Sequence, residues 1–148
     1  MNKQVWFGSS ELQKDKMKSV NSNKFYFGKP HGGLWTSPYI NGSSPWIRFA
    51  KSVDLSGVEN DEAWVLKPSS RANVLHFNTK RDLMKVETKK VDNYKVLNYR
   101  DIFEKYDAIK VSHDLIGVGP FREWDCKSVL WDTWNFDWIV KLSEYENN

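Results

Sequence analysis

The sequence lacks the features of secreted proteins and of proteins that cross a membrane. Its 148 residues include one cysteine, Cys126, so no disulfide can form within the chain. It has no apolar run of about 20 residues that would span a bilayer, and no charged-then-apolar leader. We therefore expect a cytoplasmic protein that does not insert into a membrane.

The sequence also lacks the usual metal and phosphate motifs. Its histidines, His31, His76 and His113, show neither Cys-x-x-Cys nor His-Glu-x-x-His spacing, so we predict no metal site. The patterns Gly-x-x-x-x-Gly-Lys-Ser/Thr and Gly-x-Gly-x-x-Gly are absent, which disfavours P-loop and Rossmann folds. A nucleotide would have to bind to a different fold.

Tryptophan is the residue type that is present in excess. The chain has 8 Trp, more than the core of a domain this size needs, so we expect several of them to line a binding surface. Those at 6, 35, 64 and 138 alternate with polar neighbours, which is also typical of core positions on strands. The net charge is only +3. Trp interleaved with Lys leaves open a binder of single-stranded nucleic acid.

The pattern of apolar residues predicts one α+β domain spanning 1–148, with a mixed or antiparallel sheet and short flanking helices. Strands are predicted at 4–7, 34–36, 63–66, 73–77, 108–111, 128–131 and 138–142, and 25–27 is a further apolar stretch. Helices are predicted at 11–20, from 45 to before 55, after a cap at 78 or 79, and at 99–106. Residues 21–23 are predicted as a turn, and 28–33 and 115–121 as loops. The strands at 63–66 and 73–77 are predicted to pair as a hairpin. Ser44 is the predicted cap of the second helix and Pro45 its first residue.

Two segments combine residue types that suit ligand binding. Segment 29–37 (Lys-Pro-His-Gly-Gly-Leu-Trp-Thr-Ser) joins a cation, paired glycines, an aromatic ring and two hydroxyls. Segment 124–131 reads Trp-Asp-Cys-Lys-Ser-Val-Leu-Trp. Together they resemble a group of bacterial and phage proteins with Lys-Pro, Gly-Leu-Trp, Ser and late Trp-Asp, Ser, Trp signatures. That group is similar in layout to the ADP-ribosyltransferase superfamily.

The resemblance implies a split sheet and three site elements. In the superfamily a first strand ends in a polar residue, glycine and a hydroxyl, a second carries a hydroxyl motif with an aromatic, and a late strand bears a carboxylate. Segments 5–9, 34–37 and 125–130 resemble these elements, and 106–109 resembles the strand opening of small members, including one class of phage anti-CRISPR proteins. The implied function is ADP-ribosyl transfer from NAD, the substrate, to a protein or nucleic-acid acceptor. The chain would then be a bacterial or phage effector, acting in the host cytoplasm if a phage encodes it.

The residues implied by the resemblance fall into two sets. Those for NAD binding are Phe7, Gly8, Ser9, Lys29, Gly33, Leu34, Trp35, Thr36 and Ser37. Those for catalysis are Asp125, Ser128, Asp114 and His113. Trp35 would offer a face to the cationic nicotinamide ring, the backbone of 32–33 would approach its amide or the phosphates, and Lys29 would pair with the pyrophosphate.

The chain departs from the superfamily at the catalytic positions. Phe7 stands where a histidine or arginine is usual, and no Glu-x-Glu occurs in the late strand, so Asp125 or the earlier Asp114 would supply the carboxylate. A carboxylate there would stabilise the positive charge that develops on the ribose as the nicotinamide bond breaks. His113 next to Asp114 is a possible acid/base pair.

Each of these residues also has a structural interpretation. Asp125 can cap a turn, Lys29 can be a solvated loop charge, and the paired glycines can serve a turn alone. Lys127 would lower the pKa of Cys126, but no histidine nearby completes a nucleophile, so we expect a structural thiol. The alternative function is a catalytically inactive binding or inhibitor module on the same fold.

Overall fold

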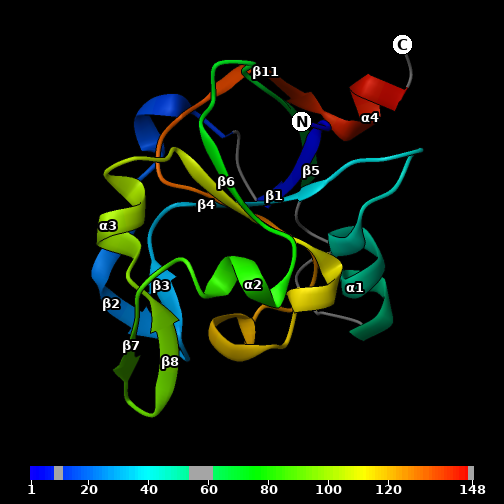
Figure 1. Ribbon diagram of the computed structural model, residues 1–148. Coiled ribbons are helices and arrows are strands. Elements are labelled where there is room, and N and C mark those ends of the chain that lie inside the picture. Colours follow the sequence, from blue (N-terminus) through cyan, green and yellow to red (C-terminus); the bar gives the residue numbers. More distant parts are fainter. Residues whose placement is uncertain (9–11, 54–61, 147–148) are drawn as a thin grey trace.

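A seven-stranded sheet forms the centre of the computed structural model, which describes residues 1–8, 12–53 and 62–146 (Figure 1). The strand order is β11-β5-β1-β4-β10-β9-β6, and only β6 and β9 pair in parallel. The strands are β1 (Gln4–Gly8), β4 (Leu34–Pro38), β5 (Glu62–Pro68), β6 (Val74–Phe77), β9 (Ala108–Val111), β10 (Val129–Trp131) and β11 (Phe136–Lys141). The predicted α+β class with a mostly antiparallel sheet is confirmed.

Both faces of the sheet are buried, because successive residues of a strand point to opposite sides. On β10, Leu130 packs in one hydrophobic cluster with Phe77 and Ile109. Its neighbours Val129 and Trp131 pack in a second cluster on the other face. The sheet therefore separates two cores, and the Trp131 side chain is fully buried in one of them.

Two small hairpins lie outside this sheet, together at the lower left of Figure 1. They are β2 (Asn21–Tyr26) with β3 (Lys29–His31), and β7 (Thr88–Val91) with β8 (Tyr94–Leu97). Each has a two-residue turn with positive φ at both positions, 49° and 81° at Phe27 and Gly28, 48° and 72° at Asp92 and Asn93. Such turns match the twist of the paired strands.

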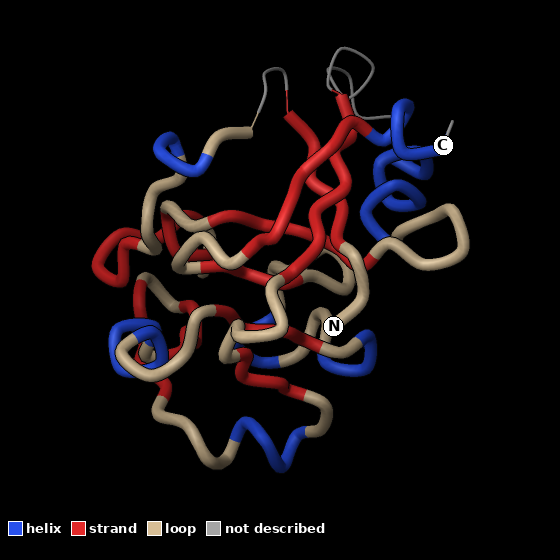
Figure 2. The backbone as a smooth tube through the Cα atoms, turned by 90° about the horizontal axis from the view of Figure 1, so that it is seen from above, coloured by secondary structure: helices blue, strands red, loops and turns tan. Residues whose placement is uncertain are grey.

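The helices are short and flank the strands (Figure 2). They are α1 (Pro45–Val53), α2 (Lys80–Leu83), α3 (Tyr99–Phe103) and α4 (Leu142–Glu146). The predicted cap of α1 is confirmed, since the backbone N–H of Ile47 donates to Ser44 Oγ at 3.1 Å. Within the described ranges, no helix is long and apolar enough to cross a membrane.

Several local predictions were wrong. Over 12–20 the structure has one 3₁₀ turn, Lys14–Lys16, in place of the predicted helix, and Glu11 lies outside the described residues. Leu12 is the only buried residue of that stretch, so a helix there would have no apolar face to bury. Segment 115–121, predicted as a loop, begins at the last residue of the 3₁₀ turn His113–Leu115 and contains a second 3₁₀ turn, Gly119–Phe121.

The hairpins and one strand pairing were also mispredicted. Segments 21–23 and 28–33 were predicted as a turn and a loop, but they supply β2 and β3, which alternation did not reveal because β2 is largely exposed and polar. No element was predicted for the second hairpin. Strands β5 and β6 do not form a hairpin, since β5 lies between β11 and β1 while β6 is at the opposite edge.

Candidate functional site

The sheet opens between β1 and β4, and a pocket lies at the opening. The two strands pair only at Gln4 with Pro38 and Val5 with Ser37. Beyond Val5, β1 pairs with β5 alone and β4 pairs with β10. The pocket has a volume of about 260 Å³. It is lined by Trp6, Phe7, Lys29, Trp35, Thr36, Ser37, Trp46, Trp124, Asp125, Cys126 and Ser128.

The pocket brings together most of the residues that the sequence singled out. Seven of the lining residues were predicted for the site: Phe7, Lys29, Trp35, Thr36, Ser37, Asp125 and Ser128. They come from β1, β3, β4 and the segment before β10. Segments that are distant in the sequence therefore meet at one place.

Other predicted residues lie elsewhere. Gly33 packs against Val20 and Leu130, and Leu34 is buried in the second cluster, so neither lines the pocket. His113 and Asp114 are exposed on the 3₁₀ turn that follows β9. Ser9 lies outside the described residues. Gly8 ends β1 beside the pocket, where a Cβ atom would overlap the indole ring of Trp6.

Aromatic rings form the walls of the pocket. Trp35 meets the buried Trp124 edge to face, with ring centroids 4.7 Å apart, so its ring is held by packing. On the other side Trp46 contacts Phe7 at 6.1 Å and stacks on Phe49 at 5.4 Å. Trp46 was not predicted as a site residue, because an aromatic in the first turn of a helix looks the same in sequence whether it faces a core or a pocket.

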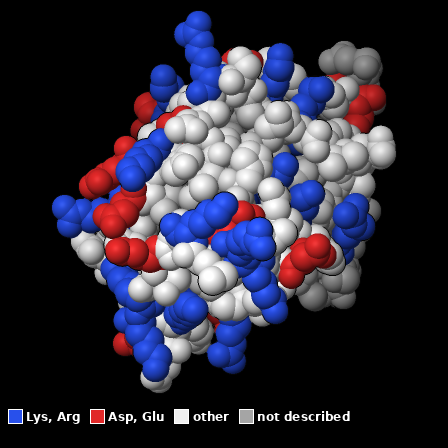
Figure 3. Space-filling view, viewed as in Figure 1, with Lys and Arg blue, Asp and Glu red and all other residues white. Residues whose placement is uncertain are grey.

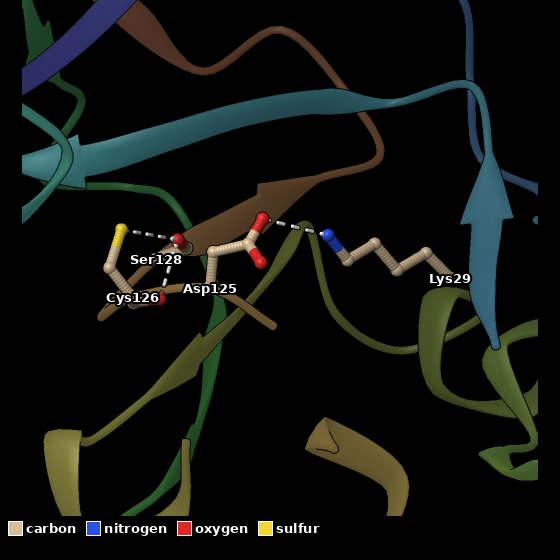
Figure 4. A network of polar contacts seen from close by, with 4 residues as sticks. All are labelled: Lys29, Asp125, Cys126 and Ser128. Atoms are coloured by element: carbon tan, nitrogen blue, oxygen red, sulfur yellow. Dashed lines mark hydrogen bonds and ion pairs between the residues drawn. The ribbon is translucent and has the colours of Figure 1, made fainter. Parts of the chain in front are cut away.

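An ion pair joins two predicted residues at the pocket. Lys29 Nζ lies 3.2 Å from Asp125 Oδ2, reaching from β3 to the segment before β10 (Figure 4). The Lys29 ammonium is also 6.0 Å from the centroid of the Trp35 ring. Their side chains are 31% and 48% exposed. Exposed pairs of this kind stabilise a protein by about 0–1 kcal/mol, so a ligand can replace either partner at small cost.

The hydroxyl groups around the pocket are used to hold its walls. Ser37 Oγ donates to the Lys127 carbonyl at 2.9 Å and accepts from the backbone N–H of Trp46 at 3.3 Å. Ser128 Oγ donates to the Cys126 carbonyl at 2.9 Å. These bonds tie β4 to α1 and to the late segment, so Ser37 positions the aromatic walls.

The Thr36 hydroxyl belongs to the core and faces away from the pocket. It donates to Gln4 Oε1 at 2.8 Å and accepts from Trp131 Nε1 at 2.9 Å, and all three side chains are buried. Trp131 packs in the second cluster, on the opposite side of β4 from Trp35. The contribution of Thr36 to the pocket is therefore not its hydroxyl, in contrast to the predicted role.

The Cys126 thiol is half-buried at the pocket. Burial raises its pKa, and the nearby Lys29 opposes that effect only in part. Its Sγ lies 3.8 Å from Ser128 Oγ. The predicted lowering of its pKa by Lys127 was wrong: the pKa is raised, because desolvation of the thiolate outweighs the hydrogen bond with Ser128 and the charge of Lys29.

A second cavity of about 380 Å³ shares Asp125 and Cys126 with the pocket. Its lining includes His113 and two cations, Arg48 and Lys127. His113 is thus separated from the pocket by the Asp125–Cys126 segment. Among the side chains that the structure describes, no group of three or more His, Cys, Asp or Glu could hold a metal ion.

Comparison of the chain with protein-family models, with curated proteins and with solved structures finds no match.

Proposed function

We propose that the pocket between β1 and β4 binds NAD and that the protein transfers ADP-ribose to a macromolecular acceptor. One observation carries this proposal: the three segments that resemble the superfamily's site elements line one pocket. The opening of the sheet beyond Val5 also agrees with the split sheet that the resemblance implies. An ADP-ribosyltransferase-like fold is part of the proposal.

The size and shape of the pocket suit the nicotinamide end of the dinucleotide. Its volume of about 260 Å³ is near the lower end of ligand pockets, which begin at roughly 300 Å³. The Trp35 ring, supported by Trp124, offers an aromatic face to the positively charged nicotinamide. The rest of NAD would lie at the rim, beside Lys29.

The ion pair at the rim gives this binding a mechanism. Pyrophosphate oxygens compete with Asp125 for the Lys29 ammonium. When the pyrophosphate replaces Asp125 as the partner of Lys29, the Asp125 carboxylate is free to face the ribose. When the nicotinamide–ribose bond breaks, its electron pair leaves with the nicotinamide nitrogen, and the carboxylate stabilises the positive charge on the sugar. A lone pair of the acceptor then forms the new bond to the ribose carbon that the nicotinamide has left, and the acceptor's proton passes to Asp125.

The same contacts favour a second candidate, a binding module without catalysis. Asp125 is held by Lys29, Ser128 donates to the Cys126 carbonyl, and Phe7 stands where the superfamily usually has a histidine or arginine. In that case the pocket or a basic face would hold a partner and NAD would remain intact. The product distinguishes the two candidates.

The test is release of free nicotinamide from NAD, measured chromatographically with cell extract as the source of acceptors. We expect release by the native protein and a loss of at least about 100-fold in Asp125→Asn, since one transition-state contact is worth roughly 10²–10³ in rate. Asp137→Asn is the matched control: its carboxylate also pairs with a lysine, Lys67, and is equally 48% exposed. That variant should release nicotinamide at the native rate.

The outcomes separate the candidates. Full release by Asp125→Asn removes Asp125 from the mechanism. If no nicotinamide appears, but millimolar NAD raises the melting temperature, the binding module is correct; NAD at about 100 times its Kd adds roughly 2.7 kcal/mol, or several degrees. If no nicotinamide is released and NAD does not raise the melting temperature, NAD is not the ligand.

A further inference from the structure

The positive charge of the chain is concentrated on the two hairpins. Segments 21–31 and 88–97 carry five lysines and one acidic residue, a net charge of +4 against +3 for the whole chain. These residues are Lys24, Lys29, Lys89, Lys90, Lys95 and Asp92. In the space-filling view, basic side chains gather at the lower left, where Figure 1 draws the hairpins (Figure 3). The rest of the chain has no positive excess.

Two of these lysines face each other without a structural reason. Lys90 and Lys95 are direct partners in the β7–β8 ladder, and both are exposed. Like charges opposite one another on a hairpin destabilise it. The pair is therefore unfavourable for folding and suits an anion bound between them.

Aromatic rings are exposed at the tip of the neighbouring hairpin. Tyr26 is 66% exposed and Phe27 is 57% exposed, and their rings contact each other at 4.5 Å. Phe27 also contacts Tyr94 at 6.4 Å, which places the tips of the two hairpins side by side. The exposed rings of Tyr26 and Phe27 and the lysines of the two hairpins thus form one surface, which we call the hairpin surface.

The backbone at Phe27 is in the left-handed region, with φ of 49°. This region is unfavourable for a bulky residue and is relaxed for glycine or asparagine. The turn therefore holds a strained phenylalanine whose ring is mostly exposed, and an outlier of this kind points to a functional role.

A cavity of about 220 Å³ lies between the hairpin tips and segment 119–123. Its lining includes Phe27, Tyr94, Lys95 and Arg122. Two rings and two cations thus line one cavity. The one acidic residue of this lining, Glu123, lies 3.8 Å from Arg122.

We propose that the hairpin surface binds single-stranded nucleic acid, with bases stacked on Tyr26 and Phe27 and backbone phosphates on the lysines. Unpaired bases expose the faces that aromatic side chains stack on, and an aromatic surface with cations is the usual design for such a ligand. A duplex would leave the rings without a partner. The binding does not rest on NAD. If both proposals hold, the strand is the acceptor, because Lys29 follows the Phe27–Gly28 turn and its ammonium reaches Asp125.

The first test is fluorescence anisotropy with a labelled 20-nucleotide oligothymidine and no NAD. Phe27→Gly removes the ring while keeping a residue that tolerates positive φ, so the variant should fold and bind at least fivefold more weakly. Met84→Ala is the control, since Met84 is 85% exposed and follows α2, outside both hairpins. It should bind as the native protein does.

The second test measures how affinity depends on salt. Each phosphate contact contributes about −0.7 to the slope of log K against log salt for a single strand. The double variant Lys90→Gln, Lys95→Gln should therefore lose about 1.4 of that slope. A matched control with two exposed lysines outside the hairpins, Lys80→Gln with Lys105→Gln, should keep the native slope.

Several results would overturn the proposal: no binding by the native protein at 50 mM salt, native affinity in Phe27→Gly, or equal affinity for a 20-base-pair duplex. Equal competition by polyglutamate would show that the surface takes acidic polypeptides instead. Because no NAD is present, these results leave nicotinamide release unaffected. Loss of nicotinamide release would in turn leave this binding unaffected.

Discussion

The seven-stranded sheet and the tip of the first hairpin use aromatic residues in opposite ways. In the sheet, Trp131 is fully buried and its indole N–H bonds to Thr36. At the hairpin tip, Tyr26 and Phe27 are more than half exposed. Burial of apolar surface stabilises the first set, and it contributes little to the second. The tip of the first hairpin is therefore free to serve a ligand, whereas Val96 and Leu97 of β8 belong to the core.

The aromatic rings of the pocket are intermediate between these two sets in burial. Trp35 is half-buried, packs against the buried Trp124, and has the Lys29 ammonium over its ring. It needs the rigid sheet for its position and the hairpin for its cation. Because the buried and the exposed aromatic residues are different residues, we expect substitutions to change the stability of the protein and its contacts with a ligand separately.

The largest difference is expected between Trp131→Ala and Phe27→Gly. Truncating a fully buried Trp should lower the free energy of unfolding by about 3–5 kcal/mol, whereas Phe27→Gly relieves a strained φ and should change it by about 0.5 kcal/mol or less. Urea denaturation of both variants measures this. Similar losses in the two would break the distinction between sheet and hairpin.

A smaller difference is expected between Thr36→Val and Thr88→Val. Removing the Thr36 hydroxyl leaves Gln4 Oε1 and Trp131 Nε1 buried without this partner, which costs about 1–3 kcal/mol. Thr88 is exposed on β7, and its replacement should cost about 0.5 kcal/mol or less. Denaturation midpoints compare the two. A neutral Thr36→Val would show that the buried network adds nothing to stability.

The smallest effect appears in alkaline solution. Burial raises the pKa of the Tyr99 phenol far above its usual 10, so above pH 10 only the unfolded chain readily loses this proton. Stability from the neutral phenol is complete below pH 10 and should fall by about 1.4 kcal/mol per pH unit above it. Tyr99→Phe should lack this component at pH 11, and Tyr26→Phe should retain it. Equal alkaline losses in all three proteins would contradict the assignment.

Strands and caps could be predicted where the signal is local. Segments 4–7 and 108–111 are rich in apolar β-formers and do form β1 and β9, and Ser44 before Pro45 marks the start of α1. The first hairpin escaped prediction because its strands are polar and Phe27 is an unlikely residue for a left-handed turn. Its pairing depends on contacts outside the segment.

The pocket, too, could be predicted only in part from the sequence. The residue types of 29–37 and 124–128 marked both segments as ligand-binding candidates. That Thr36 turns its hydroxyl into the core, and that Trp46 completes the wall, follows from which face of a strand or helix meets the pocket. Alternation along a strand defines two faces but does not say which one a distant segment will cover.

By itself the sequence determined the α+β class, several strands, the cap of α1, and the choice of the two segments that meet at the pocket, because these depend on neighbouring residues. Only the tertiary structure decided that β6 lies beside β9, that β1 and β4 separate beyond Val5, and that Lys29 meets Asp125. Strand neighbours are selected by packing on both faces of the sheet. That packing is a property of the whole chain, and no local pattern encodes it.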